Sequence, residues 1–570
     1  MRTARRILLV IVVLLIVFAV WSPTPGPEVP DGSILVLDVE GEYVESSAPP
    51  LLARLLGSQV RPFASLLSEI AKAERDERLA AVVFRIRPLD IGWGKAQELR
   101  DAIAAASSRG RRTVAYLEVE SFSANLEYFV ATGAQEVYAS PAAHAAVVGL
   151  SAEYLFLGGL WERLGIEFEV ERIGRYKSAA EAIAGRAMSD ATREMAGSLL
   201  DSVDRDFLAG IAAGRELPVD AVREAVAAAP VEPEEMLRWG LVDGVLERDE
   251  LALRLGGGEL VEADDYARVD PAEVGFAPVA SFALVYGSGN VVVGRGRTTP
   301  DGSPVLASDT VAEALETAAE DPEIDAIVFR IDSPGGSPLA SDIVFRAVER
   351  ARASGKPVIA SFSDVAASGG YYAAAGADAI LASPASLTGS IGVFVLRPVL
   401  AGTLDKLGIG FESLTRAPHA DIPLATRKLS DASRARLRAE VAAIYDRFVE
   451  RVAAGRKLDA LRVDAVGQGR VWTGAQAAER GLVDGLGGLR AAVLEGKRRL
   501  DIDADADVAL VIYPPPLSLY EQIDEALGGL RAEVLDRLPI GAVLHRARPW
   551  LQAVRDGAPV ALLPFHLEIR

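Results

Sequence analysis

The sequence contains no cysteine and only four histidines, and this scarcity excludes several kinds of chemistry. Without cysteine the chain can form no disulfide, no thiolate nucleophile and no cysteine-ligated metal site. The histidines stand in none of the spacings that bind metals, such as H-E-x-x-H. We therefore expect neither a metal nor another cofactor. The four histidines are His144, His419, His545 and His566.

Positive charge is scarce as well. The 570 residues carry a formal net charge of −20, and no basic stretch offers a surface for phosphates, so we expect no nucleic-acid partner. Arginine supplies nearly all of the positive charge, since only eight of the 60 basic residues are lysine. Half of the residues are hydrophobic, which is enough for several domains with large cores.

The N-terminus carries a long apolar run. Arginines at positions 2, 5 and 6 precede fifteen apolar residues at 7–21, ILLVIVVLLIVFAVW, an order typical of a cleaved signal peptide or an uncleaved signal anchor. No small-x-small cleavage site follows, so we favour an anchor over residues 1–22 and a Pro-rich linker over 23–32. Because arginines stay on the cytoplasmic side, the chain would cross the plasma membrane once, with its body outside the cytoplasm.

The rest of the chain is an internal repeat with an offset near 243 residues. AAVVFRI at 80–86 recurs as DAIVFRI at 325–331, and GLVDG occurs in both halves. We predict two copies of one domain, residues 33–275 and 278–500, followed by a C-terminal extension, 501–570. We expect each copy to contribute one catalytic group, a general-base lysine from the first copy and a nucleophilic serine from the second.

Short β-rich runs alternate with Ala- and Arg-rich helical segments in each copy. ILVLDVEG, AVVFRI and TVAYLEV in the first copy correspond to FALVYGSG, AIVFRI and PVIASFS in the second. This alternation predicts an α/β fold with a parallel sheet and helices on its faces. In the extension, VALVIY predicts a further strand. The amphipathic segments after it are compatible with a partner contact, a membrane-facing edge or a plain packing arm.

Ser368 lies in SDVAASGGYYAAAGAD, residues 363–378, among neighbours too small to cover it. A serine on a Gly-flanked turn at a helix start can act as a nucleophile, with backbone N–H groups directed at a developing oxyanion. It can also be an ordinary N-cap or a packing contact. The repeat offset maps Ser368 onto Asn125, so the first copy has lost the serine turn.

A second glycine turn is also confined to the second copy. DSPGGS follows the AIVFRI strand at 332–337, where the first copy has RPLDI at 87–91. A Gly-rich turn between a strand and a helix is a natural site for exposed backbone donors, here at Gly335 and Gly336. Taken alone, it could be a mere tight turn.

Lys177, in GRYKSAAE, is present only in the first copy, because the offset maps it onto Ala420. A guanidinium does not lose its proton in proteins, whereas a desolvated lysine ammonium can. Lys177 is therefore a candidate general base for Ser368. A lone lysine is more often a solvated surface charge, but each copy keeps one half of a serine–lysine pair.

These motifs, DSPGGS, DVAASGGYYAA at 364–374, LTGSIGV at 387–393 and GRYKSAAE, together resemble the signal peptide peptidase family, also called protease IV, in its long two-domain bacterial form. The resemblance covers nearly the whole chain. It implies two tandem Clp protease and crotonase-like ββα-spiral domains after an N-terminal membrane helix. It also implies a homo-oligomer, a tetramer in the long form, with its body in the periplasm, that degrades cleaved signal peptides and other apolar peptides.

The resemblance also assigns roles to single residues. It makes Ser368 the nucleophile, Lys177 the general base and Ser390 the residue that orients the lysine. Gly369 and a glycine of the Gly335–Gly336 turn would supply the oxyanion N–H groups. Two alternatives stay open: a crotonase-like acyl-CoA enzyme whose Gly-Gly turn holds an enolate, and a non-catalytic membrane scaffold.

Overall fold

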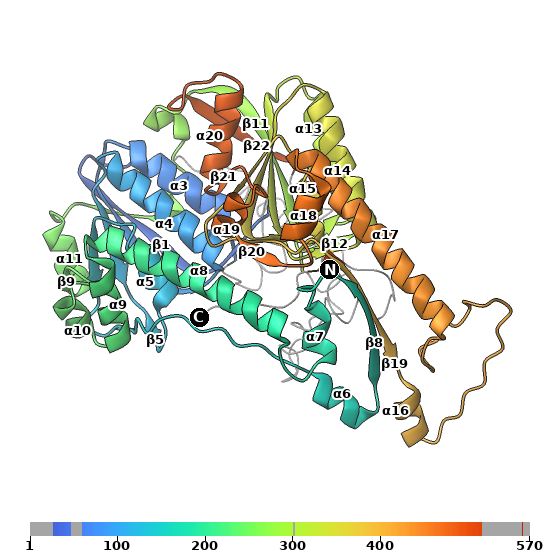
Figure 1. The fold of residues 1–570 in the computed structure, drawn as a ribbon. Helices are drawn as coiled ribbons and strands as arrows, with labels where there is room; N and C mark the ends of the chain where they lie inside the picture. The colour runs from blue at the N-terminus through green and yellow to red at the C-terminus, as the bar shows by residue number, and fades with distance from the viewer. Residues whose placement is uncertain (1–26, 47–59, 300–302, 516–560, 563–570) are drawn as a thin grey trace, which may run out of the picture.

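The computed structural model describes residues 27–46, 60–299, 303–515 and 561–562 (Figure 1). The predicted anchor, residues 1–22, lies outside the described residues, and so do the start of the linker and most of the C-terminal extension. Among the residues that the structure does describe, no helix has the length and apolarity needed to cross a membrane.

The first copy is built on a parallel sheet. Its strands are β1 (Ser33–Val44), β2 (Arg61–Pro62), β3 (Leu79–Asp90), β4 (Thr113–Leu117), β5 (Glu120–Ser121), β6 (Glu136–Ala139), β7 (His144–Ala145), β8 (Glu167–Ile173), β9 (Gly244–Val245) and β10 (Leu260–Glu262). Seven of them form one sheet in the order β10-β1-β3-β4-β6-β9, with β2 paired to the end of β1. Leu35 and Leu37 of β1 face one core, whereas Ile34 and Val36 face another, because helices cover both faces.

The helices of the first copy follow the strands along the chain. They are α3 (Phe63–Arg75), α4 (Trp93–Ser108), α5 (Asn125–Ala131), α6 (Gly158–Leu164), α7 (Ala179–Ala184), α8 (Asp190–Arg215), α9 (Val219–Ala228), α10 (Pro233–Arg238), α11 (Arg248–Arg254) and α12 (Ala263–Tyr266), with a 3-10 turn, η1 (Pro271–Val274). Figure 1 shows the long helix α8 running from the first copy toward the second. Met195 and Leu199 of α8 pack there against Ala367 and Leu387.

The second copy repeats this architecture. Its strands are β11 (Pro278–Ser288), β12 (Asn290–Val292), β13 (Val305–Ala307), β14 (Ala326–Ser333), β15 (Gly335–Gly336), β16 (Val358–Ala367), β17 (Ala379–Ala382), β18 (Leu387–Gly389), β19 (Val393–Val399), β20 (Val471–Thr473), β21 (Gly485–Leu486), β22 (Asp507–Tyr513) and β23 (Ala561–Leu562). The main sheet has eight strands in the order β20-β18-β16-β14-β11-β22, with β17 joining β16 to β21. Only the pairing of β18 with β20 is antiparallel in it.

The helices of the second copy and a small sheet complete the ββα pattern. The helices are α13 (Ser308–Glu320), α14 (Pro338–Ala353), α15 (Gly369–Ala374), α16 (Ala401–Lys406), α17 (Asp431–Arg456), α18 (Ala460–Val466), α19 (Gly474–Glu479) and α20 (Leu489–Arg499). The small sheet has the order β13-β12-β15-β23. Along the chain, β11 and β14 of the main sheet are each followed by short strands of the small sheet and then by a helix. The predicted fold class, two tandem α/β domains of ββα units, is confirmed.

The edge strands place the start of the C-terminal extension. β22, which is the predicted VALVIY strand, pairs with β11 at the edge of the second sheet, and β10 pairs with β1 at the same position of the first sheet. The two strands therefore occupy equivalent places, although β22 lies beyond the boundary expected at residue 500. We propose that the second repeat extends through β22 to Tyr513; the other predicted boundaries stay predictions.

An antiparallel two-stranded ribbon joins the two copies. β8 of the first copy pairs with β19 of the second along its whole length, from Ile173 opposite Val393 to Glu167 opposite Val399. In Figure 1 this ribbon runs away from both sheets and carries α6 and α16 at its far end. Its near end brings the residues after β8 to the residues before β19, and these two segments contain Lys177 and Ser390.

Candidate active site

Ser368 occupies the sharp turn between β16 and α15. Its backbone angles, φ 54° and ψ −115°, are ones that residues other than glycine rarely adopt, at a cost on the order of 1–3 kcal/mol. Hydrolases use such strained strand-to-helix turns to expose a nucleophilic serine. The Ser368 N–H donates to the Gly389 carbonyl over 2.8 Å, which fixes the turn. The side chain forms no capping bond with α15, so the plain N-cap interpretation does not account for it.

Lys177 is brought to this turn by the β8–β19 ribbon. Tyr176 donates its N–H to the Gln468 carbonyl over 2.8 Å, which ties the lysine segment to the second copy. Gly469 lies directly against Lys177, since a Cβ at this glycine would lie 2.5 Å from the lysine backbone nitrogen. The lysine is therefore enclosed by residues of both copies.

The structure brings Lys177, Ser368 and Ser390 together within one chain. The Lys177 Nζ atom lies 2.8 Å from Ser368 Oγ, 2.9 Å from Ser390 Oγ and 3.0 Å from the Ser390 carbonyl oxygen. All three residues are fully buried. Burial lowers the pKa of Lys177 well below its ordinary value, because an ammonium without water is costly. A neutral amine in contact with a serine hydroxyl can accept its proton.

The three predicted oxyanion glycines lie on two turns beside Ser368. Gly369 is the first residue of α15, where N–H groups have no partner inside the helix. Gly335 has φ 105° and donates its N–H to Ser333 Oγ over 3.2 Å. A Cβ at Gly336 would lie 2.2 Å from the Val291 carbonyl oxygen, so a larger residue does not fit. Their role as oxyanion donors stays a prediction.

The backbone of the Gly335–Gly336 turn is also a strand edge. β23 pairs with it antiparallel, with Leu562 opposite Gly335 and Ala561 opposite Gly336. β23 also lies beside β19. An extended segment therefore fits between the glycine turn and the ribbon that carries Ser390 and Lys177.

The first copy has no serine at the equivalent turn. Asn125, the first residue of α5, is buried, and its Nδ2 donates to the Gly149 carbonyl over 2.8 Å. Its Oδ1 accepts the N–H groups of Val148 and Gly149. These bonds hold the loop that corresponds to the Ser390 loop, so the side chain has a structural task there.

Sequence reasoning missed three neighbours of the site. Ser333 accepts the Gly335 N–H and donates its own hydroxyl to the Gly289 carbonyl over 2.6 Å. Ser333 lay inside the DSPGGS motif, but no pattern indicates where its side chain points. Gln468 and Gly469 lie about 290 residues beyond Lys177, and their segment carried no chemical signal at all.

The chain is similar in sequence to known proteins over most of its length. The model of peptidase family S49 matches residues 106–261 and 350–503. The chloroplastic serine protease SPPA of Arabidopsis thaliana is 32% identical over 522 residues, which cover 90% of this chain and 75% of that protein. Protease 4 of Salmonella typhi is 28% identical over 495 residues, which cover 80% and 77%. A putative signal peptide peptidase SppA of Enterococcus faecium is 34% identical over 173 residues, which cover 30% and 50%.

These comparisons confirm the resemblance inferred from the motifs. The family model matches each half of the chain once, as expected for a tandem repeat. The chain belongs to peptidase family S49 and is a serine peptidase.

Proposed function

We propose that this chain is a serine endopeptidase that cleaves apolar peptides, including the remnants of cleaved signal peptides, with Ser368 as nucleophile and Lys177 as general base. The observation that carries the proposal is the 2.8 Å contact between a buried lysine amine and a serine hydroxyl on a strained turn. The names protease 4 and signal peptide peptidase of the relatives support the substrate class. Membership of a peptidase family sets aside the acyl-CoA enzyme and the non-catalytic scaffold.

The reaction would proceed through an acyl-enzyme. Neutral Lys177 takes the proton from Ser368 Oγ, and the alkoxide attacks the scissile carbonyl carbon. N–H groups of Gly369 and of the Gly335–Gly336 turn stabilise the oxyanion. The C–N bond then breaks, and Lys177 gives its proton to the leaving amine. A water molecule, deprotonated by the same lysine, hydrolyses the ester and releases Ser368.

Ser390 would keep the Lys177 amine directed at Ser368. Its hydroxyl and its carbonyl oxygen both contact Nζ, at 2.9 and 3.0 Å. Ser390 itself has φ 52°, and its N–H donates to the Arg470 carbonyl over 2.7 Å, so its own position is fixed. A flexible four-carbon side chain held at two points loses little further freedom in the transition state.

The substrate would bind as an extended strand. β23 shows the geometry that an antiparallel segment takes against Gly335 and Gly336. Main-chain hydrogen bonds of this kind give affinity without a sequence requirement, which suits an enzyme for varied apolar peptides.

We further propose that the chain is anchored by residues 1–22 in the inner membrane with a periplasmic body, and that it assembles as a homo-oligomer, a tetramer by family resemblance. Exposed apolar side chains at the far end of the β8–β19 ribbon support a subunit contact, since such patches are uncommon on monomers. They come from two segments joined by a bond from Thr403 Oγ1 to the Leu164 carbonyl, and they are Leu160, Leu164, Leu407, Ile409 and Phe411. Sedimentation of the purified chain and of Phe411→Glu tests this, because a monomeric parent would contradict it.

The function is tested by hydrolysis of a fluorogenic apolar peptide by the full chain in detergent. Ser368→Ala and Lys177→Ala should each abolish turnover while the fold is retained. Lys428→Ala is a matched control, because Lys428 is exposed and forms an ion pair with the exposed Glu167 at the surface. If Lys177→Ala keeps activity near that of the parent, the general base lies elsewhere.

A further inference from the structure

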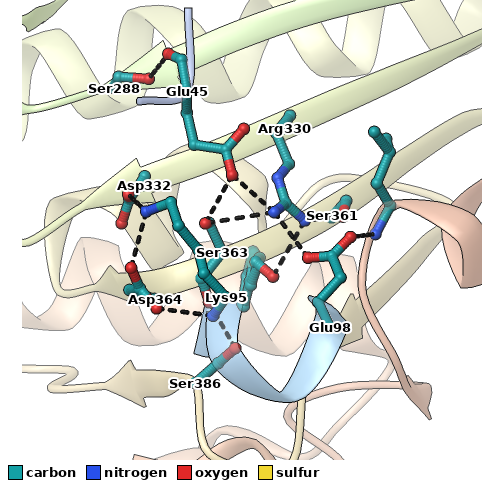
Figure 2. A network of polar contacts seen from close by, with 12 residues as sticks. Glu45, Lys95, Glu98, Ser288, Arg330, Asp332, Ser361, Ser363, Asp364 and Ser386 are labelled. Carbon is teal, nitrogen blue, oxygen red and sulfur yellow. Dashed lines mark hydrogen bonds and ion pairs between the residues drawn. The ribbon is translucent and has the colours of Figure 1, made fainter. Parts of the chain in front are cut away.

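A buried cluster of charges lies where α4 of the first copy meets the second sheet (Figure 2). The Lys95 Nζ atom lies 2.5 Å from Asp332 Oδ2 and 2.7 Å from Asp364 Oδ2, and the Lys95 side chain is 5% exposed. Burial alone would lower the pKa of Lys95, but the carboxylates of Asp332 and Asp364 raise it above its ordinary value. Lys95 is therefore an ammonium shared between two carboxylates.

The two carboxylates stand on the strands that lead into the active site. Asp332 lies near the end of β14, three residues before Gly335, and Asp364 lies on β16, four residues before Ser368. Asp332 also accepts the N–H of Val365 through Oδ1 over 3.1 Å, at a point where the pairing of β14 with β16 is irregular. Lys95 thus joins the end of β14, which precedes the Gly335–Gly336 turn, to the part of β16 that precedes Ser368.

Backbone contacts with the second copy hold Lys95 firmly in this place. Asp364 accepts the backbone N–H groups of Gly92 and Lys95, over 3.1 and 2.8 Å, so it caps α4 from the other copy. A Cβ at Gly94 would lie 2.6 Å from the Ser363 carbonyl oxygen, so the first turn of α4 packs directly against the backbone of β16. The position of the ammonium is therefore set by backbone contacts as well as by charge.

Two glutamates of the first copy also bind the same strands, through three hydrogen bonds. Arg330 of β14 donates to Glu45 over 2.6 Å and to Glu98 over 2.7 Å, and Ser363 of β16 donates to Glu45 over 2.7 Å (Figure 2). The repeat equivalent of Arg330 is Arg85, which pairs within its own copy. Arg330 is therefore tied to the other copy, whereas the ion pairs that the structure describes for Arg85 stay within the first copy.

We propose that Lys95 is a positioning residue of the peptidase reaction: its ammonium holds the ends of β14 and β16 together, so that the Gly335–Gly336 turn and Ser368 address the same substrate carbonyl. This inference rests on the proposed function. Without the ammonium, the two half-buried carboxylates would repel each other, and the two strand ends would separate.

The test uses the full chain and the fluorogenic peptide. Lys95→Met should lower kcat by roughly 10- to 100-fold with KM within about twofold of the parent, because misplaced reacting groups slow the chemical step more than binding. Lys95→Arg should recover part of kcat, since a guanidinium can bridge two carboxylates. The pH midpoint of kcat/KM that reports Lys177 should be the same in Lys95→Met as in the parent.

Two further variants separate positioning from stability. The double variant Lys95→Met/Asp332→Asn relieves the repulsion, so its Tm should return toward that of the parent while its kcat stays low. If Lys95→Met alone does not fold, the double variant is used in its place. Lys72→Met is a matched control that should lower Tm and leave kcat at the parent value. Lys72 is buried like Lys95, but within the part of the chain that the structure describes its Nζ donates to two backbone carbonyls, those of Tyr266 and Val269, at 2.5 and 3.1 Å, and to no carboxylate.

The inference is overturned if folded Lys95→Met has the kcat of the parent, or if kcat recovers together with Tm in the double variant. A failure of the proposed function looks different, because Ser368→Ala would then retain activity whatever happens at Lys95. All Lys95 effects are measured as ratios to the active parent.

Discussion

Lys177 is the residue whose environment decides the chemistry. It is surrounded by hydroxyl and carbonyl oxygens of Ser368 and Ser390, and burial is what lowers its pKa. Lys95 is equally buried, but it faces two carboxylates that keep it charged. Two lysines in one molecule thus have opposite protonation tendencies because their neighbours differ.

The depressed pKa predicts the pH dependence of the reaction. Only the neutral amine accepts the Ser368 proton, so kcat/KM should fall as the pH drops through the pKa of Lys177 and should level off above it. The midpoint should lie well below 10.5, the ordinary value for lysine. A pH series of kcat/KM measures this midpoint, and a midpoint near 10.5 would mean that Lys177 is not desolvated during the reaction.

The same burial predicts a gain in stability when the amine is removed. Below its unfolded pKa the unfolded chain carries Lys177 as an ammonium, and because burial lowers the folded pKa, folding favours release of that proton, at a cost in free energy that grows as the pH falls from the unfolded pKa toward the folded one. Lys177→Met keeps the apolar stem and removes this cost. We expect an inactive variant with a Tm at or above that of the parent at pH 7, measured by calorimetry; a large loss of Tm would contradict it.

At the scale of elements, the site depends on two pieces of backbone: the β8–β19 ribbon and the glycine turn of β15. The ribbon carries Lys177 from one copy to Ser390 of the other. The turn brings peptide N–H groups beside Ser368, and Gly336 is required in it because Val291 leaves no room for a side chain at that position.

Gly336→Ala tests the glycine turn. The added Cβ would lie 2.2 Å from the Val291 carbonyl oxygen, so β15 must move away from β12. If the turn supplies an oxyanion donor, kcat should fall on the order of 100-fold. Gly197→Ala in α8 is the control, since no atom lies within 4 Å of its added Cβ and activity should be unchanged. Activity of Gly336→Ala near that of the parent would remove the turn from the mechanism.

Sequence reasoning reached some of these elements and not others. The serine turn and the glycine turn were predicted because small residues cluster around Ser368 and at Gly335–Gly336, and the first copy lacks them at the equivalent positions. The pairing of β8 with β19 was not, because an alternating strand such as EFEVERI does not indicate its partner. Lys95 was missed for a different reason. The scarcity of lysine that drew attention to Lys177 applied equally to Lys95, but its carboxylate partners are 237 and 269 residues away.

At the scale of the whole molecule, the two copies have become dependent on each other. Each has lost one half of the serine–lysine pair, and the surviving halves meet at the junction. The repeat itself, and with it the tandem architecture, could be predicted from the sequence because many matching segments share one offset. The sheet edge formed by β22 could not, because its apolar pattern differs from that of β10.

The C-terminal strand predicts competition with the substrate. β23 pairs with Gly335 and Gly336, where the substrate strand is proposed to bind. A chain that ends at residue 560 should therefore have a lower KM for the peptide with kcat unchanged. Leu562→Pro keeps the length of the chain but removes a strand N–H, and it should act in the same direction. The measurement is KM and kcat of both variants for the fluorogenic peptide. An unchanged KM in both would contradict the competition.

The most direct test of the serine–lysine site is to label the full chain with a fluorophosphonate and to locate the adduct by mass spectrometry of its peptides. The account predicts one adduct, on Ser368, in the parent chain, and a much slower reaction in Lys177→Ala because the serine is then not deprotonated. An adduct on a different serine, or an equal labelling rate without Lys177, would contradict it.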